Sequence, residues 1–222
     1  MDFETGTRDA YDRLSVTHFG HLNSSVEDRP IERAVLQAFA DLVLREPGPV
    51  ADVGCGAGVL TRHLDDLGLD VFGVDLSPAM IAHARAAHPD LRFAEGSLLR
   101  LDLPDAALAG LLSSYSLIHV PWAERPRALA EFHRVLRPGG VLMLAFQIGD
   151  EAYCPVVVQE MGLEVTWYRQ QPDDLVELLA AGGFSLLFRA ERAPAAGEST
   201  PQGYLLATRN PEQGERGDLE RD

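Results

Sequence analysis

The sequence predicts an α/β fold, a doubly wound and mostly parallel sheet of seven strands with helices on both faces. Short apolar runs alternate with segments of helical period from residue 30 onward, which is typical of parallel strands joined by helices. The last two apolar runs, residues 184–189 and 204–208, have no helical segment between them. We therefore expect these two strands to pair as an antiparallel hairpin at the edge of the sheet.

The individual elements follow from apolar periodicity and from residues that begin or end them. Five further strands are expected at residues 50–53, 71–74, 91–94, 108–113 and 141–146. Helices are expected at residues 31–44, 60–67, 78–87, 124–136 and 173–181. Ser77 and Pro78 are typical of an N-cap and a first helical turn. Pro138-Gly139-Gly140 and Gly182-Gly183 are expected to end the last two helices.

The chain should form one domain with additions. Residues 1–29 are expected to form an N-terminal helical cap segment before the main domain, residues 30–209. The connection at residues 148–172 is too long for a plain loop, so we expect it to cap the substrate. Residues 210–222 are polar and acidic, which predicts a disordered tail.

Composition excludes several classes of protein. All 19 Lys and Arg residues are arginine, so neither a Schiff-base lysine nor a phosphate-loop lysine is present. The net charge of −15 disfavours nucleic acid and anionic membrane surfaces as partners. Two cysteines, an acidic start and the absence of a long apolar run predict a cytoplasmic chain with neither a disulfide framework nor a membrane span.

A glycine-rich turn is the strongest functional signal. The strand at residues 50–53 runs into Gly54-Cys55-Gly56-Ala57-Gly58, and the next strand ends at Asp75. Glycines let a ligand approach the backbone, the helix start offers free N–H groups, and the acid can accept ribose hydroxyls. A dinucleotide fingerprint would require glycine where Val59 stands, which weighs against a nicotinamide-dependent oxidoreductase. A tight turn without a ligand remains an alternative.

The acid-x-G-x-G-x-G pattern from Asp52 to Gly58 resembles motif I of the class I S-adenosylmethionine-dependent methyltransferases. Four later segments resemble other motifs of that family in the same order: residues 73–80 (GVDLSPAM), 96–98 (GSL), 115–119 (YSLIH) and 134–140 (RVLRPGG). The resemblance implies a three-layer Rossmann-like fold and S-adenosyl-L-methionine as the cofactor.

The resemblance also implies which residues hold that cofactor. Asp52 would face its amino group, and Asp75 would bind the ribose. Leu76 and Met80 would form apolar walls for the adenine. Ser97 stands where the family usually has an acid that accepts from the adenine amino group, so backbone groups of Ser97 and Leu98 should do most of this recognition. The expected cofactor residues are Tyr11, Asp52, Gly54, Cys55, Gly56, Gly58, Asp75, Leu76, Met80, Gly96, Ser97, Leu98, Ser114 and Tyr115.

Purely structural roles are alternatives for three of these residues. Asp52 could only stabilise the turn, and Asp75 could only cap the following helix, although Ser77 suits that cap better. Cys55 is expected to be a small filler rather than a nucleophile, because methyl transfer from a sulfonium requires no enzyme nucleophile.

The expected reaction is methyl transfer to a small organic acceptor in secondary metabolism. His119, after the fourth strand, is the candidate base, titrating near neutrality, although a positioning role is an equal alternative. His18, His21, Tyr153 and Trp167 are expected to bind the acceptor, and Tyr11 with residues 148–172 should form a lid. No metal is expected, since two histidines are too few ligands.

Three alternatives to this function are kept. They are an S-adenosylmethionine-binding protein without transfer activity, a nicotinamide-dependent oxidoreductase, and a methyltransferase acting on nucleic acid or protein. The acceptor atom stays open, and the chain is expected to be a monomer or homodimer without nucleic-acid or membrane partners.

Overall fold

The computed structural model describes residues 2–17, 26, 29–153, 162, 165–195 and 197–211. Within these residues a seven-stranded sheet has the order β3-β2-β1-β4-β5-β9-β8. Its parallel strands are β1 (Val50–Val53), β2 (Val71–Asp75), β3 (Arg92–Glu95), β4 (Leu108–Ser114) and β5 (Leu136–Gln147). The antiparallel strands are β8 (Phe184–Arg192) and β9 (Gln202–Arg209), and β9 lies between β5 and β8.

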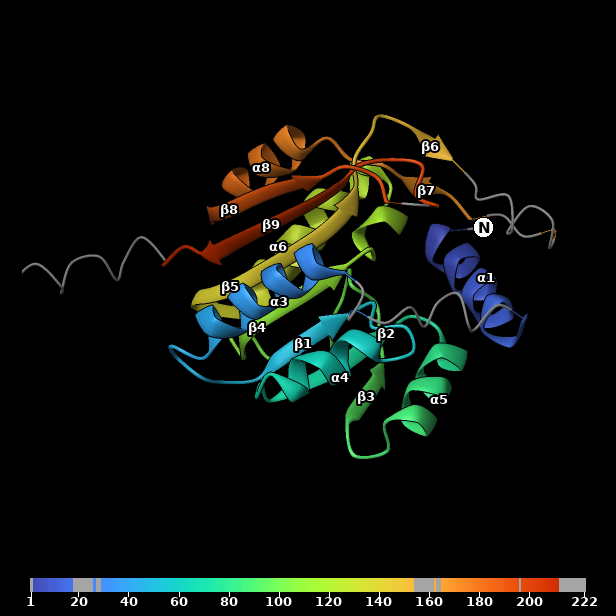
Figure 1. The fold of residues 1–222 in the computed structure, drawn as a ribbon, viewed down its shortest axis with the longest axis horizontal. Coiled ribbons are helices and arrows are strands. Elements are labelled where there is room, and N and C mark those ends of the chain that lie inside the picture. Colours follow the sequence, from blue (N-terminus) through green and yellow to red (C-terminus); the bar gives the residue numbers. More distant parts are fainter. Residues whose placement is uncertain are drawn as a thin grey trace, which may run out of the picture.

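Helices cover both faces of the sheet (Figure 1). The helices are α1 (Phe3–Thr17), α3 (Pro30–Val43), α4 (Val59–Asp66), α5 (Pro78–Ala87), α6 (Arg125–Val135) and α8 (Pro172–Ala181). Apolar residues of α3 and α4 form a core with one face, and those of α6 and α8 form a core with the other. The predicted three-layer fold, with its mostly parallel sheet and antiparallel edge, is therefore confirmed.

The predicted boundaries hold within a few residues, with one clear exception at β5. This strand begins at Leu136 rather than at residue 141, and it runs through Pro138-Gly139-Gly140. Leu136 is fully buried and pairs with Leu108, and the register shifts between Leu108 and Gly110. Gly139 has a φ of 76°, so it supplies the irregular step that a continuous strand needs here. The proline and glycines thus bend a strand instead of ending a helix.

Two additions to the sheet lie near the carboxyl ends of the parallel strands. Helix α1 packs beside α5 (Figure 1), and a small sheet pairs β6 (Ala152–Tyr153) with β7 (Trp167–Tyr168). After β4 the chain forms two 3₁₀ turns, η1 (Leu117–His119) and η2 (Trp122–Glu124). Most of the expected tail, residues 212–222, lies outside the described residues.

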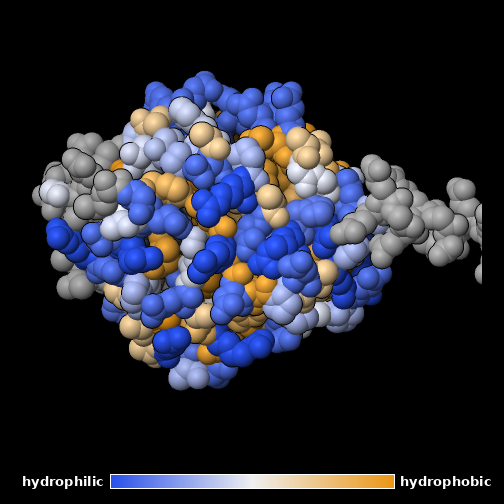
Figure 2. All heavy atoms as spheres, turned by 180° about the vertical axis from the view of Figure 1, so that it is seen from behind, coloured by the Kyte–Doolittle hydropathy of each residue, from blue (hydrophilic) through white to orange (hydrophobic). Residues whose placement is uncertain are grey.

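The surface opposite the view of Figure 1 is largely hydrophilic, with smaller hydrophobic areas between the polar residues (Figure 2). Among the described helices, none combines the length and the apolar character that crossing a membrane requires.

Candidate functional site

A cavity opens at the carboxyl ends of β1, β2 and β4, which is where ligands bind in open α/β sheets. Helix α1 forms part of its wall. The cavity is lined by most of the residues that the sequence predicted for the cofactor: Tyr11, Gly54, Cys55, Gly56, Asp75, Leu76, Met80, Gly96, Ser97, Leu98, Ser114 and Tyr115. His119 also lines it. Residues far apart in the chain therefore meet around one space.

The glycine turn leaves that space open. Gly56 has a φ of 52°, and a Cβ placed on it would meet no atom within 4 Å. Gly54, by contrast, packs on the protein, because its Cβ would lie 2.2 Å from Cβ of Ser116. The N–H groups of Gly54 and Cys55 donate to the Val74 carbonyl at 2.7 and 3.1 Å. The turn is thus held on one side while Gly56 leaves a cradle on the other.

Asp75 brings a carboxylate to this cradle at the end of β2. Its Oδ2 accepts from Gly56 N–H and its Oδ1 from Ser77 N–H, both at 2.8 Å. Burial raises the pKa of Asp75, against the effect of these hydrogen bonds. A carboxylate offers about four lone-pair directions, so each oxygen can accept one more donor. Ser77 caps α5 by accepting from Met80 N–H at 3.1 Å, which leaves Asp75 directed to the turn and the cavity.

Two expected cofactor residues do not line the cavity. Asp52 is 1% exposed, and its Oδ2 accepts from the Thr61 hydroxyl at 2.7 Å, so it ties β1 to α4. Burial raises the pKa of Asp52 to about 7. This position matches the turn-stabilising alternative, and the expectation that Asp52 faces the cofactor's amino group, directly or through water, stays a prediction. Gly58 has a φ of 81°, and its Cβ would lie 2.7 Å from the Phe93 ring, so packing on β3 requires this glycine.

Cys55 is buried beside the turn, and its Sγ lies 3.7 Å from the Gly56 carbonyl oxygen. Burial raises the pKa of the Cys55 thiol, with the nearby carboxylates of Asp52 and Asp75 adding to the effect. A protonated thiol is a poor nucleophile, so this environment fits a filler.

Helix α1 is fixed over the cavity by polar side chains on one of its faces. Asp12 Oδ1 accepts from the Ser77 hydroxyl at 2.5 Å and from Ala79 N–H at 3.2 Å. Arg8 Nε donates to the Leu76 carbonyl at 3.3 Å, and Glu4 Oε1 accepts from the Ser97 hydroxyl. Of these residues, sequence reasoning had singled out Leu76 and Ser97 for the cofactor and Ser77 for the helix cap, and it missed Glu4, Arg8 and Asp12. The sequence feature that could have revealed them is the spacing of residues 4, 8, 11 and 12, which places these residues on one face of a helix.

His119 lies in η1 against Tyr11 and Trp167. Its Nε2 is 3.0 Å from the Tyr11 hydroxyl, and its ring meets the Tyr11 and Trp167 rings edge-on, with centroids 5.1 and 5.9 Å away. Burial lowers the pKa of His119 to about 4, which corrects the expected titration near neutrality. Its Nδ1 is buried and has no hydrogen-bond partner among the described residues. The imidazole is therefore neutral at physiological pH.

The expected acceptor residues divide into two groups. Trp167 and Tyr153 pack edge-on with centroids 5.7 Å apart, and the Tyr153 hydroxyl donates to Gln147 Oε1 at 2.9 Å. Neither of them lines the cavity, although Trp167 packs on His119, which does line it. His18 and His21 lie outside the described residues.

Sequence reasoning missed the part of the cavity wall that α3 and β9 form. Glu32, Leu36 and Tyr204 line it. Arg192 donates to Glu32 Oε1 at 2.8 Å and to the Tyr204 hydroxyl at 3.3 Å, which joins the two elements. Tyr115 also lines the cavity, and its φ of 53° is a backbone conformation that costs energy in a non-glycine residue. Nothing local in the sequence predicts that β9 reaches this cavity.

A metal centre is not indicated by the part of the chain that the structure describes, where no group of three His, Cys, Asp or Glu residues could hold an ion.

Comparison with known proteins assigns the central part of the fold. A family model described as a methyltransferase domain matches residues 50–140. A malonyl-[acyl-carrier protein] O-methyltransferase of Pectobacterium atrosepticum is 40% identical over 97 residues, which cover 43% of this chain and 37% of that protein. A probable S-adenosylmethionine-dependent methyltransferase of Mycolicibacterium smegmatis is 34% identical over 144 residues, or 62% of this chain and 52% of that protein. The chain thus spans about half or less of the length of these curated relatives.

A solved structure extends the likeness over nearly the whole chain. The 1,6-didemethyltoxoflavin-N1-methyltransferase of Burkholderia thailandensis superposes with a TM-score of 0.70 at 22% identity. The match covers 94% of this chain and 90% of that one, and at this identity it shows the fold. Residues 50–140 thus match a methyltransferase domain, and the ordered motifs and the cavity at the glycine turn are similar to those of the class I S-adenosylmethionine-dependent methyltransferases.

Proposed function

We propose that this chain transfers a methyl group from S-adenosylmethionine to a small organic acceptor. The observation that carries the proposal is one continuous cavity, which runs from the Gly56 cradle and Asp75 to Tyr115 and His119. One end fits the cofactor of the family, and the other end offers room and polar groups for a second molecule.

The cofactor end fits the chemistry of S-adenosylmethionine residue by residue. Asp75 can accept the ribose hydroxyls, and Leu76, Met80 and Leu98 offer apolar walls for the adenine. Gly56 lets the ligand approach the backbone. When bound, this cofactor supplies a methyl group that its sulfonium has already activated. The protein's own work is then to align the two molecules and to exclude water.

The acceptor end favours a small, partly polar organic molecule. Apolar side chains of Leu36, Met143 and Ala145 line it together with the polar groups of Tyr115 and Tyr204. Such a mixture is typical of small-molecule pockets. The net charge of −15 weighs against a nucleic acid as acceptor.

The named relatives support diversity of acceptors rather than one acceptor. One acts on a malonyl-acyl carrier protein and the solved neighbour on 1,6-didemethyltoxoflavin. A role in secondary metabolism is part of our proposal, and it rests on the small, mixed character of the acceptor end.

His119 is proposed to position ligands rather than to remove a proton. Its pKa of about 4 makes it a weak base at neutral pH, and its Nε2 is already paired with the Tyr11 hydroxyl. Through Tyr11 it holds α1 against the carboxyl edge of the sheet. We keep the lid expected from Tyr11 and residues 148–172 as part of the proposal, and we propose that α1 is the main element that closes the cavity.

Calorimetry with S-adenosylhomocysteine and with NADH tests the proposal. We expect micromolar affinity for the former, about −8 kcal/mol, and no binding of the latter. Asp75→Ala should weaken binding by about 1.5–3 kcal/mol for each ribose hydrogen bond lost. Asp102→Asn, which removes an exposed carboxylate, is the matched control and should bind as the wild type does.

Other outcomes would support the alternatives. Tight binding of NADH alone would favour an oxidoreductase. Binding of S-adenosylhomocysteine without methyl transfer to any member of a broad panel of phenols, thiols, amines and carboxylates would favour a binding protein without transfer activity.

A further inference from the structure

This inference rests on the proposed function, which places the adenine beside Leu76 and Leu98, and that end of the cavity contains a carboxylate from outside the sheet. Glu4, in the first turn of α1, lines the cavity together with Phe3, Leu76, Ser97 and Leu98. Its Oε1 accepts from the Ser97 hydroxyl, which follows β3. The cofactor cavity is thus closed at this end by a residue 93 positions away in the sequence.

The hydrogen bonds of Ser97 show which group remains able to bind a ligand. Ser97 Oγ accepts from Leu99 N–H at 3.0 Å and donates its one proton to Glu4. A hydroxyl has one donor and two acceptor directions, so most of its capacity is used. A carboxylate has about four acceptor directions, and Glu4 uses one of them for Ser97. Glu4 therefore brings the stronger free acceptor to this end.

We propose that Glu4 recognises the 6-amino group of the cofactor's adenine. An exocyclic amino group donates two hydrogen bonds, and the carboxylate of Glu4 can accept one of them with charge assistance. A 6-oxo purine presents an acceptor at the same position, which would face the carboxylate as a like partner. Glu4 thus selects adenine, and Ser97 orients Glu4 rather than contacting the base as the main acceptor.

This arrangement makes recognition of the base depend on α1. Asp12, Arg8 and Tyr11 fix the same helix at Ser77, Leu76 and His119. Helix α1 must therefore be docked for Glu4 to reach the cavity. The N-terminal helix acts both as a wall and as the element that reads the base.

The test compares S-adenosylhomocysteine with S-inosylhomocysteine, in which an oxo group replaces the 6-amino group. Calorimetry should show that the wild type prefers the amino ligand by about ten- to a hundredfold, as expected of a site built to hydrogen-bond a donor. In Glu4→Gln the preference should fall to within about threefold, because an amide can present either its oxygen or its NH₂ group.

Two controls separate reading of the base from docking of the helix. Asp9→Asn removes an exposed carboxylate from the same helix and should keep both affinities. Asp12→Asn weakens the attachment of α1 at Ser77 and Ala79. Because α1 is a wall of the cavity, both ligands should bind only the form in which it is docked, so both affinities should fall by the same factor and their ratio should stay unchanged. The double variant Glu4→Ala with Ser97→Asp should regain the preference, because the aspartate supplies an acid from the sheet side.

An unchanged ratio in Glu4→Gln, or equal wild-type affinity for the two ligands, would overturn this inference and leave the proposed function standing. Failure of the wild type to bind S-adenosylhomocysteine would overturn both. A ratio that collapses in Asp12→Asn while surviving in Glu4→Gln would assign the discrimination to helix docking instead.

Discussion

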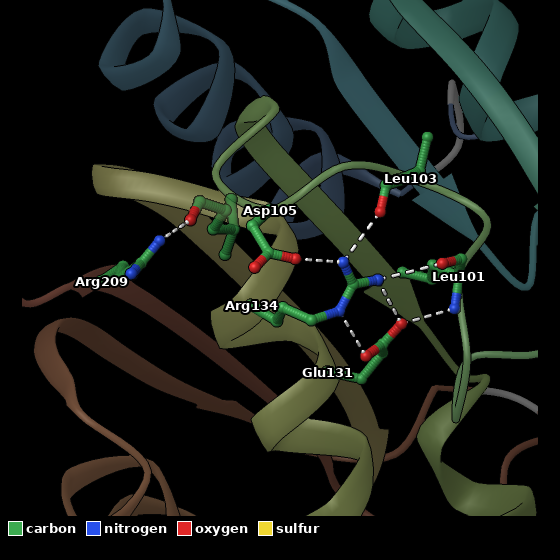
Figure 3. Close-up of polar contacts among 7 residues, drawn as sticks. Leu101, Leu103, Asp105, Glu131, Arg134 and Arg209 are labelled. Carbon is green, nitrogen blue, oxygen red and sulfur yellow. Dashed lines mark hydrogen bonds and ion pairs between the residues drawn. The ribbon is translucent and has the colours of Figure 1, made fainter.

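Two polar regions of this molecule differ in how completely their groups are paired. At the end of α6, Arg134 uses all five N–H donors: two bind the carbonyls of Leu101 and Leu103, one binds Asp105, and two bind the carboxylate of Glu131 (Figure 3). Glu131 also accepts from Leu101 N–H at 2.6 Å. This cluster fixes the connection between β3 and β4 to α6.

At the carboxyl edge of the sheet, by contrast, Asp52, Asp75 and His119 lack partners of opposite charge within the described ranges. Asp52 is buried and Asp75 is half-buried, neither forms an ion pair in the part of the chain that the structure describes, and burial raises the pKa of both. His119 is neutral, and its Nδ1 lacks a partner among the described residues. The hydrogen bond from Arg134 instead lowers the pKa of Glu131. The cluster at α6 therefore stabilises charged groups, whereas burial at the carboxyl edge disfavours the charged forms of Asp52, Asp75 and His119.

The first prediction tests the comparison through the pH dependence of stability, and it has the largest expected effect. The folded chain keeps the proton of Asp52 up to about pH 7, whereas an unfolded chain releases it near 3.8. Stability contributed by this proton is present below about pH 4 and is lost as the pH rises to about 7. The free energy of unfolding of Asp52→Asn, measured relative to the wild type, should therefore be higher at pH 8 than at pH 4, by as much as about 4 kcal/mol.

Denaturant unfolding at pH 4, 6 and 8 measures this difference, and Glu131→Gln is the matched control. Because Arg134 lowers the pKa of Glu131, its contribution is present above the unfolded pKa and is lost as the pH falls. The glutamine variant should destabilise the protein at pH 8 and have a smaller effect at low pH. If both variants show the same sign of pH dependence, the contrast between the two regions is wrong.

The second prediction removes Arg134 itself. Arg134→Ala leaves the Leu101 and Leu103 carbonyls and the Glu131 carboxylate without their donor, so unfolding free energy should fall by about 3 kcal/mol. The melting temperature should fall by about 6–12 °C for a chain of this size. Arg127→Ala, on the same helix, loses only an exposed pair with Glu124 and should change stability by less than about 0.5 kcal/mol. Affinity of the folded Arg134 variant for S-adenosylhomocysteine should stay near that of the wild type.

The parts of the molecule that sequence reasoning predicted well are those with local causes. The glycine turn, the acid at the end of β2 and the Ser77 cap each depend on a few adjacent residues, and the structure places Gly56, Asp75 and Ser77 as those patterns indicate. Strand alternation with helices predicted the sheet and its antiparallel edge for the same reason.

What sequence reasoning missed depends on long-range contacts. Asp52 lies in a strand whose residues are all buried, and only the position of Thr61 on α4 shows that its carboxylate points into the protein. Glu4 and Tyr204 reach the cavity from opposite ends of the chain. The shift of the His119 pKa depends on rings from α1 and β7 that no motif joins to it.

The last prediction sharpens the comparison with the smallest change. Tyr11→Phe removes the one hydroxyl that pairs with His119 Nε2, a neutral hydrogen bond worth about 0.5–1.5 kcal/mol. Because the site depends on few such bonds, amides of α1 should exchange faster, and affinity for S-adenosylhomocysteine should fall by about three- to tenfold. Global unfolding should change little, since Ala10 and Leu14 of α1 belong to a small separate cluster, and Phe3 packs only against the border of a main core. Tyr168→Phe, whose ring packs on Trp122, is the control and should leave exchange in α1 unchanged. Equal exchange of α1 in Tyr11→Phe and the wild type would show that Asp12 and Arg8 hold the helix without help from Tyr11.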